Sequence, residues 1–241
     1  MSIRPLRQAR TTAWRKRWSV GRPSAGSSPT TASRATVVVT GIEIVVFDGF
    51  DELDAFGPLE VLSSAAGRGA PFELALVGVT GPGRVRAHHG THVVVSAGLG
   101  QPDAVIVPGG GWLNRAPAGA WAEAQRGELP ARLAALAPSL RWTASVCTGA
   151  LLLASAGLLN GRTATTNRNA LVELAATGAN VVTHRVVDDG PVVTAGGLSA
   201  GLDLGLWLIQ REVSADLAHD VADSLEYAPR GDVWHAGIVR Q

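Results

Sequence analysis

The sequence predicts an α/β protein in which a doubly wound, mostly parallel sheet is sandwiched by helices. Apolar runs rich in β-branched residues, such as residues 42–47, are typical of strands that are buried on both faces. Strand and helix patterns alternate along the chain, which favours parallel strands joined by helical crossovers. The 241 residues, 46% of them hydrophobic, are enough to close one sizeable core.

The first half of the chain begins this alternation after residue 36. Residues 53–66 place leucines and a phenylalanine at three-residue spacing on one helical face, and Gly67 follows as a stop signal. The β-branched and apolar runs around this helix read as strands, two of them turning back on each other near Gly90. We expect the helix at 53–66, strands at 37–39, 42–47, 72–79 and 104–107, and an antiparallel pair at 84–87 and 92–95.

The second half repeats the pattern. Apolar stripes at helical spacing alternate with short β-branched runs up to Tyr227. We expect helices at 129–136, 149–156, 171–177, 198–209 and 215–227, and strands at 141–146, 181–185 and 192–195.

The two ends of the chain differ from this body. Residues 1–36 contain eight arginine and lysine residues and no acidic residue, and 21–35 are mostly Gly, Ser, Pro, Thr and Arg. Such a composition cannot bury enough apolar surface to offset the entropy of ordering the chain. We therefore expect a disordered basic tail at 1–36, one folded domain at 37–230 and a C-terminal surface tail at 231–241.

Composition also bears on the class of partner. No window approaches the roughly 18 apolar residues that a membrane-spanning helix needs, so no membrane span is expected. Beyond residue 36 the chain has 13 basic against 20 acidic residues, which gives no reason to expect a nucleic-acid partner. One cysteine can form neither an intramolecular disulfide nor a cysteine-cluster metal site, which suits a cytoplasmic protein.

Cys147, that single cysteine, lies where a predicted strand meets a predicted helix. The small residues Thr148 and Gly149 leave room for a sharp turn there, the arrangement called a nucleophile elbow. The N-terminus of the helix is expected to lower the pKa of the thiol, and the thiolate is the nucleophile. The alternative is a buried cysteine that only packs.

A glycine-rich turn follows the neighbouring strand. Residues 108–111 read Pro-Gly-Gly-Gly, and glycines there let the backbone approach a ligand and offer an N–H to a developing oxyanion. Trp112 comes next, and we expect Gly111 and Trp112 to line a pocket. His88, His89 and His92 cluster near a turn, but no acid or cysteine beside them completes a ligand set, so no metal is expected.

Five motifs, in chain order, resemble those of the ThiJ/PfpI superfamily. They are Leu-Asp-Ala-Phe-Gly-Pro-Leu-Glu-Val-Leu at 53–62, Val-Pro-Gly-Gly-Gly at 107–111, Ser-Val-Cys-Thr-Gly-Ala at 145–150, Ala-Gly-Leu-Leu-Asn-Gly-Arg-Thr-Ala-Thr-Thr at 156–166 and Thr-Ala-Gly-Gly-Leu-Ser-Ala-Gly-Leu-Asp at 194–203. Within the superfamily they are most similar to isonitrile hydratases and to the sensor-like domains of arabinose-operon-type transcription regulators. The resemblance implies a flavodoxin-like fold.

The resemblance to isonitrile hydratases also implies an activity and a site. It implies a hydro-lyase that converts a small isonitrile into an N-substituted formamide without a cofactor, in a homodimer. Cys147 matches the nucleophile, Asp54 matches the acidic residue beside the thiol, and Thr148 follows the cysteine as it does there. Gly110 and the Thr148 amide match the oxyanion hole. An Asp at the start of a helix can also be an N-cap, which is the alternative role for Asp54.

The chain departs from the superfamily pattern at one place. Where relatives often read Thr-Thr-His-Trp, this chain has Thr165-Thr166-Asn167-Arg168, so Asn167 and Arg168 are expected to alter the pocket wall and the substrate. No histidine follows Cys147, which disfavours a peptidase dyad.

Two other functions remain open from the sequence. A ligand-binding or regulatory domain could keep the fold without the chemistry, although only about 14 residues follow Tyr227, too few for a DNA-binding segment. A glyoxalase-like or deglycase-like reaction typically needs a glutamate and a histidine near the cysteine, which Asp54 and the absent histidine disfavour.

Overall fold

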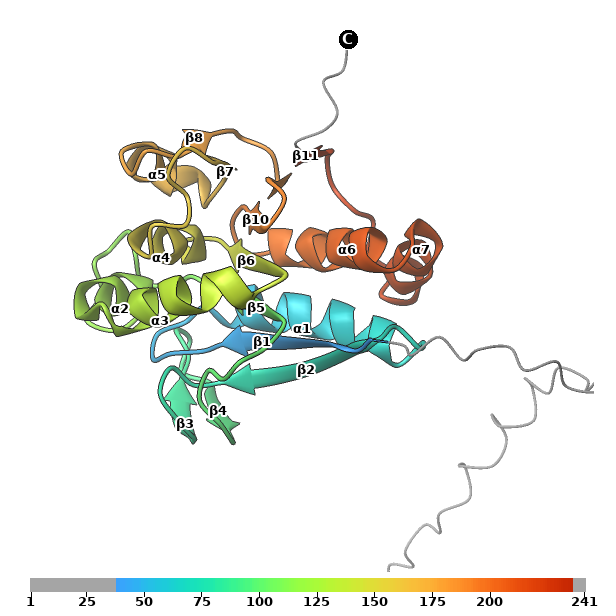
Figure 1. Cartoon of the computed structure of the whole chain (residues 1–241), viewed down its shortest axis with the longest axis horizontal. Coiled ribbons are helices and arrows are strands. Elements are labelled where there is room, and N and C mark those ends of the chain that lie inside the picture. Colours follow the sequence, from blue (N-terminus) through green and yellow to red (C-terminus); the bar gives the residue numbers. More distant parts are fainter. Residues whose placement is uncertain (1–37, 236–241) are drawn as a thin grey trace, which may run out of the picture. The chain divides into compact units, whose positions relative to one another are not determined.

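A seven-stranded sheet forms the centre of residues 38–235, the part of the chain that the computed structural model describes (Figure 1). The strand order is β11-β9-β10-β6-β5-β1-β2, and every neighbouring pair is parallel except β9 with β10. The strands are β1 (Thr40–Val45), β2 (Phe72–Val77), β5 (Ala104–Val107), β6 (Trp142–Val146), β9 (Val186–Asp188), β10 (Val192–Ala195) and β11 (Val233–His235). The predicted mostly parallel sheet is confirmed.

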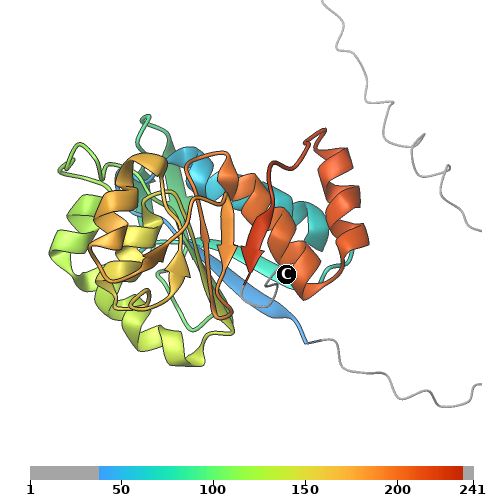
Figure 2. The ribbon, with the colours of Figure 1, turned by 90° about the horizontal axis from the view of Figure 1, so that it is seen from above.

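Helices cover both faces of this sheet (Figure 2). On one face α1 (Glu52–Ala66) packs against α6 (Ala200–Glu212) and α7 (Ala215–Ser224). On the other face α2 (Ala120–Arg126) packs against α3 (Glu128–Leu136) and α4 (Gly149–Ser155). Central strands such as β5 and β6 are buried along their whole length, because both of their faces lie under helices.

Smaller elements lie outside the main sheet. They are the antiparallel pair β3 (Gly83–Arg86) and β4 (His92–Val95), the parallel pair β7 (Thr163–Ala164) and β8 (Asn180–Val181), the short helix α5 (Leu171–Ala175), and the 3₁₀ turns η1 (Ala137–Ser139) and η2 (Arg168–Ala170). The hairpin predicted near Gly90 is confirmed.

Three sequence predictions are wrong in the region after α4. The expected strand at 181–185 is mostly loop, and strand β9 begins directly after it, at Val186. The helix expected from Leu198 begins at Ala200, because Leu198 has a φ of 49°, in the left-handed region. The helix expected to reach Tyr227 ends at Ser224, and the Tyr227 hydroxyl donates to Asp203 instead.

Two further elements were not expected. The C-terminal surface tail predicted at 231–241 contains β11, which pairs with β9 and stacks His235 on the ring of Trp207. Three residues are too short for a sequence pattern to identify a strand. Helix α2 was also missed; it lies between Gly119 and Gly127, two glycines with positive φ. The basic tail predicted at 1–36 lies outside the described residues.

The sheet places several loops at one edge. The chain leaves β1 toward β2 on one side and later returns to β5 on the other, so the strand order reverses between β1 and β5. In open α/β sheets, ligands bind outside the carboxyl ends of strands at such a reversal. The segments that follow β1, β5 and β6 meet there, and they carry Asp54, Gly110 and Cys147.

No helix among the described residues is long and apolar enough to cross a membrane.

Candidate active site

The predicted sharp turn at Cys147 is confirmed. Cys147 connects β6 to α4 with a φ of 56°, a left-handed conformation that is uncommon outside glycine. Its backbone N–H donates to the Gly196 carbonyl oxygen at 2.8 Å, which ties the turn to the end of β10. Such backbone strain costs about 1–3 kcal/mol and persists only where surrounding contacts impose it.

Gly149 allows α4 to begin directly against the end of β5. A Cβ atom at Gly149 would lie 2.1 Å from the Val107 carbonyl oxygen, closer than any side chain can come. Gly110, with a φ of 122°, is equally restricted, because its Cβ would lie 2.4 Å from the Gly49 carbonyl oxygen. The backbone around the thiol is therefore packed too closely for side chains at these two positions.

Asp54 is fully buried in the first turn of α1. It is not the N-cap, because Asp51 takes that place and accepts the Leu53 N–H at 3.1 Å. Oδ2 of Asp54 accepts the Gly109 N–H at 3.1 Å, whereas Oδ1 has no hydrogen-bond partner among the described residues. The pKa of Asp54 is raised to about 7, mainly by burial and to a smaller extent by the negative charge of Asp51.

Cys147 is 6% exposed, and Asp54 lies close enough for its charge to act on the pKa of the thiol. Nδ2 of Asn167 donates to Sγ at 3.4 Å. The pKa of Cys147 is raised to about 12, mainly by burial and to a smaller extent by the negative charge of Asp54. The pKa of Cys147 is lowered by hydrogen bonding from Asn167 and from the backbone N–H groups of Thr148 and Leu198, but these effects are smaller than the two that raise it.

The expectation that the helix N-terminus lowers the thiol pKa is therefore wrong. Helix α4 has only seven residues, and its effect on the thiol is smaller than the loss of hydration and the neighbouring carboxylate. The raised pKa favours the neutral thiol of Cys147 at neutral pH.

The expected oxyanion hole has a different hydrogen-bond pattern. The Gly110 N–H donates to Oγ1 of Thr148 at 3.1 Å, so this amide already has an acceptor. The Thr148 hydroxyl, 3% exposed, keeps its own proton available for donation. The expected Gly110 donor is therefore already engaged within the protein.

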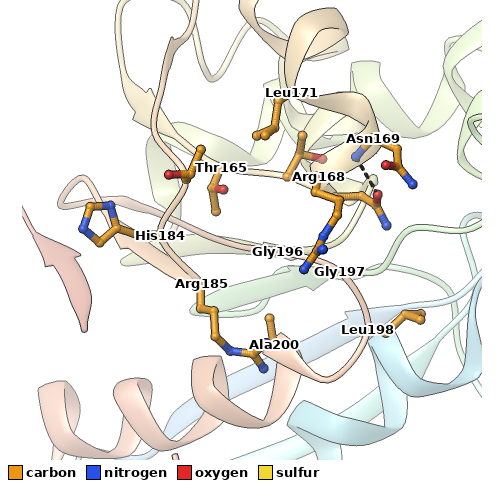
Figure 3. A pocket seen from close by; sticks show the side chains of 13 residues that line it. Thr165, Arg168, Asn169, Leu171, His184, Arg185, Gly196, Gly197, Leu198 and Ala200 are labelled. Carbon is orange, nitrogen blue, oxygen red and sulfur yellow. Dashed lines mark hydrogen bonds between the residues drawn. The ribbon is translucent and has the colours of Figure 1, made fainter. Parts of the chain in front are cut away.

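Figure 3 shows a cavity of about 580 Å³. Asn167, whose Nδ2 contacts the Cys147 thiol, is among its lining residues, whereas Cys147 itself is not. Three loop segments line the cavity: 165–169, 183–185 and 196–198, together with Leu171 and Ala200. We call these three segments the cavity wall. Asn167 and Leu198 belong to this wall and also face the thiol, so they connect cavity and sulfur.

The predicted pocket residues are divided between two places. Asn167 and Arg168 line the cavity, as expected. Gly111 and Trp112 do not line this cavity; the Trp112 ring packs edge-on against Trp121, and its Nε1 donates to Glu173. Trp112 thus joins the glycine turn to α2 and α5, a packing role that sequence proximity to the turn did not reveal.

The histidine cluster contacts the start of α1. Nδ1 of His89 lies 2.8 Å from Oε2 of Glu52, an interaction that raises the pKa of His89 and lowers that of Glu52 even though Glu52 is partly buried. Within residues 38–235 no group of three or more His, Cys, Asp or Glu side chains is arranged to hold a metal.

Two residues near the thiol were not singled out from the sequence. The Thr166 hydroxyl donates to the Cys147 carbonyl oxygen at 2.8 Å and so supports the strained turn. Leu198 has a left-handed conformation, and its backbone N–H lowers the pKa of both Asp54 and Cys147. Both lie inside motifs that the family resemblance quoted, and that position was the only available signal.

This fold and site define a class: a doubly wound α/β protein with a cysteine on a strand-to-helix turn beside a buried acid. The family model of the DJ-1/PfpI family matches residues 41–211. The chain therefore belongs to the DJ-1/PfpI family.

Two relatives in sequence are informative. A protein from Pseudomonas putida named isonitrile hydratase is 47% identical over 93 residues, which cover 39% of this chain and 41% of that protein. This chain therefore matches less than half the length of that relative. A protein of the cpoL 5′ region of Streptomyces lividans is 38% identical over 129 residues, covering 52% of this chain and 86% of that one.

Solved structures agree on the fold. A ThiJ/PfpI family protein from Pseudomonas syringae superposes with a TM-score of 0.70 at 26% identity, covering 85% of this chain and 84% of that one. Drosophila melanogaster DJ-1beta superposes with a TM-score of 0.67 at 19% identity, covering 79% of this chain and 100% of that one.

Proposed function

We propose that this protein is a cysteine-dependent hydro-lyase that adds water to a small isonitrile and releases an N-substituted formamide. Cys147 is the proposed nucleophile, and Asp54 the group that moves its proton. The observation that carries the proposal is the buried Asp54 near the Cys147 thiol, with a carboxyl oxygen that has no hydrogen-bond partner among the described residues. The identity to the isonitrile hydratase of Pseudomonas putida supports the choice of substrate.

The first step forms a carbon–sulfur bond. An isonitrile accepts both a nucleophile and a proton at its terminal carbon. As Sγ of Cys147 attacks this carbon, Asp54 takes up the thiol proton and delivers a proton to the same carbon. The product is a thioimidate, R–N=CH–S–Cys147, and Asp54 ends in the protonation state in which it began.

The second step consumes water. Its oxygen adds to the thioimidate carbon while Asp54 accepts one water proton and passes it to the substrate nitrogen. The tetrahedral adduct then collapses: the carbon–sulfur bond breaks, the remaining hydroxyl proton returns to sulfur, and R–NH–CHO leaves. The Thr148 hydroxyl, held by the Gly110 N–H, donates a hydrogen bond to the reacting group.

An acid with a pKa of about 7 suits this cycle, because at neutral pH it can both accept and donate a proton. The raised thiol pKa agrees with it too, since sulfur reacts as its proton leaves rather than from a standing thiolate. This chemistry does not use a histidine dyad.

The test is formamide production from cyclohexyl isonitrile, followed by chromatography. We expect turnover by the wild-type protein, loss of at least about 10³-fold in Cys147→Ala, and a loss of about 10²-fold or more in Asp54→Asn. Glu60→Gln is the matched control, because Glu60 is an exposed carboxylate on the same helix as Asp54.

Two outcomes would overturn the proposal. Undiminished turnover by Cys147→Ala would exclude the nucleophile. A folded wild-type protein that hydrates no isonitrile would exclude the substrate class and leave a ligand-binding or regulatory domain as the better account.

The assembly and location are part of the same proposal. We propose a homodimer that acts on a small molecule in the cytoplasm, on the basis of the family resemblance and the single reduced cysteine. Light scattering during size-exclusion chromatography tests the dimer, since a monomer mass at micromolar concentration would contradict it.

A further inference from the structure

The wall of the cavity near Cys147 is polar and positively charged, which is unusual for a site that would accept a simple alkyl isonitrile. Its wall contains threonine and asparagine side chains, two arginines and His184, and no Asp or Glu residue lines it. Apolar side chains are few: Leu171, Leu198 and Ala200. A purely aliphatic substrate would therefore meet mainly polar groups that need hydrogen-bond partners.

The two arginines of the cavity differ in what they contact. Arg185 is already paired: its Nε donates to Asp203 at 2.7 Å, and its Nη2 reaches both Asp203 and Ser199. Arg168 makes no ion pair or side-chain hydrogen bond with any residue in the described part of the chain. Its guanidinium therefore carries a positive charge whose five N–H donors are free for a ligand.

Arg168 is also the chain neighbour of a residue that contacts the reacting atom. Its chain neighbour Asn167 donates to Sγ of Cys147 at 3.4 Å, and successive Cα atoms are about 3.8 Å apart. In Figure 3 the Arg168 side chain extends from η2 toward Gly196 and Gly197, across the cavity rather than away from it. A ligand held by both residues can have only a few bonds between its reacting carbon and its charged end.

We propose that the cavity selects an isonitrile that carries a carboxylate, an isocyano acid, whose carboxylate is bound by Arg168 while its terminal carbon faces Cys147. This inference rests on the proposed function and names its substrate class. The planar guanidinium matches a carboxylate with two parallel hydrogen bonds, which a neutral substituent cannot form. The product of such a substrate is an N-formyl amino acid.

Two compounds of nearly equal shape test the charge alone: isocyanoacetate and its methyl ester. We expect wild-type kcat/KM for the acid to exceed that for the ester by about tenfold or more, the size of a charge-assisted hydrogen bond on a partly exposed group. In Arg168→Gln this ratio should fall close to one. Arg84→Gln is the control, because Arg84 is an exposed arginine on β3, away from the cavity wall, and should keep the wild-type ratio.

Binding of the product supplies a readout that does not need turnover. N-formylglycine and its methyl ester are titrated into wild type, Arg168→Gln and Arg84→Gln by calorimetry. We expect the acid to bind at least about tenfold more tightly than the ester, and we expect the difference to vanish only in Arg168→Gln.

The outcomes separate this inference from the function on which it rests. Hydration of both isonitriles at equal efficiency, or a preference for the ester, overturns the isocyano acid and leaves the hydro-lyase. Absence of any isonitrile hydration overturns the hydro-lyase, and with it the named substrate. A ratio that Arg168→Gln leaves unchanged overturns the role of Arg168 in either assay.

Discussion

The two sides of Cys147 are built differently. On one side lies the elbow, residues 146–149 with the facing segment 107–110, where almost every residue is buried and glycines allow backbone atoms to touch. On the other side the cavity wall consists of loop residues, several of them exposed, with polar and charged side chains. The difference indicates that the packed fold determines where the thiol and its acid lie, whereas the loops determine which side chains line the cavity.

The largest difference between the two sides should appear in their tolerance of added volume. Gly149→Ala places a Cβ against the backbone of β5, which cannot move as a flexible side chain does. We expect a loss of about 3 kcal/mol or more in the free energy of unfolding, measured in urea. Gly81→Ala is the control, because a Cβ there meets nothing within 4 Å, and it should change stability by less than about 0.5 kcal/mol. Equal stability of the two variants would show that the elbow is not tightly packed.

The ionised carboxylate of Asp54, on the elbow side, should lower the free energy of unfolding of the protein at neutral and alkaline pH. Its pKa in the folded protein, about 7, is above its ordinary value of 3.8. Between these values the folded state binds more protons than the unfolded state, so stability falls as pH rises through this window. Asp54→Asn keeps an acceptor for the Gly109 N–H and removes the charge, and we expect it to gain roughly 2 kcal/mol at pH 8 and much less at pH 4.

Urea unfolding of both proteins at pH 4 and pH 8 measures this gain. A variant that is less stable than wild type at pH 8 would mean that the carboxylate is stabilised by contacts other than those described.

The contrast between the elbow and the cavity wall also explains how much of the fold and of the site could be predicted from the sequence. Strands at 104–107 and 192–195 were predicted with their observed bounds, because short β-branched runs flanked by glycine or proline carry a local signal. The turn at Cys147 was predicted for the same reason, since strand, cysteine and small residues are adjacent in the chain.

The properties of the site depend on contacts between distant segments, and these could not be predicted. The pKa of Cys147 rises because the thiol is buried and because Asp54 from α1 lies near it. The left-handed Leu198, the loop at 183–185 and the three-residue strand β11 have no local pattern of their own. Most errors therefore fall in the region that forms the cavity wall or supports it.

Asn167 lies between the two sides, and its removal should have a moderate effect on the thiol. Its Nδ2 hydrogen bond lowers the pKa of Cys147 against the effect of burial. Asn167→Ala should therefore raise this pKa and slow alkylation by iodoacetamide at pH 9 several-fold. Asn169→Ala, a change of an exposed side chain on the same segment, is the control and should leave the rate unchanged. Faster alkylation in Asn167→Ala would show that the side chain shields the sulfur rather than polarising it.

The smallest effect is expected on the stability of the cavity wall. Arg168 is exposed and has no side-chain partner in the described part of the chain, so Arg168→Gln should change the free energy of unfolding by less than about 0.5 kcal/mol. Thermal unfolding by circular dichroism measures it. A loss comparable to that of Gly149→Ala would mean that the wall is as tightly constrained as the elbow.

The proposed covalent bond between Cys147 and substrate is the central claim to test. Acid quenching during isonitrile turnover, followed by mass spectrometry of the whole protein and of its peptides, detects that bond directly. We predict a mass increase of one complete isonitrile molecule, located on the peptide that contains Cys147 and absent in Cys147→Ala. An adduct on another residue, or turnover by Cys147→Ala at the wild-type rate with no adduct, would contradict the account.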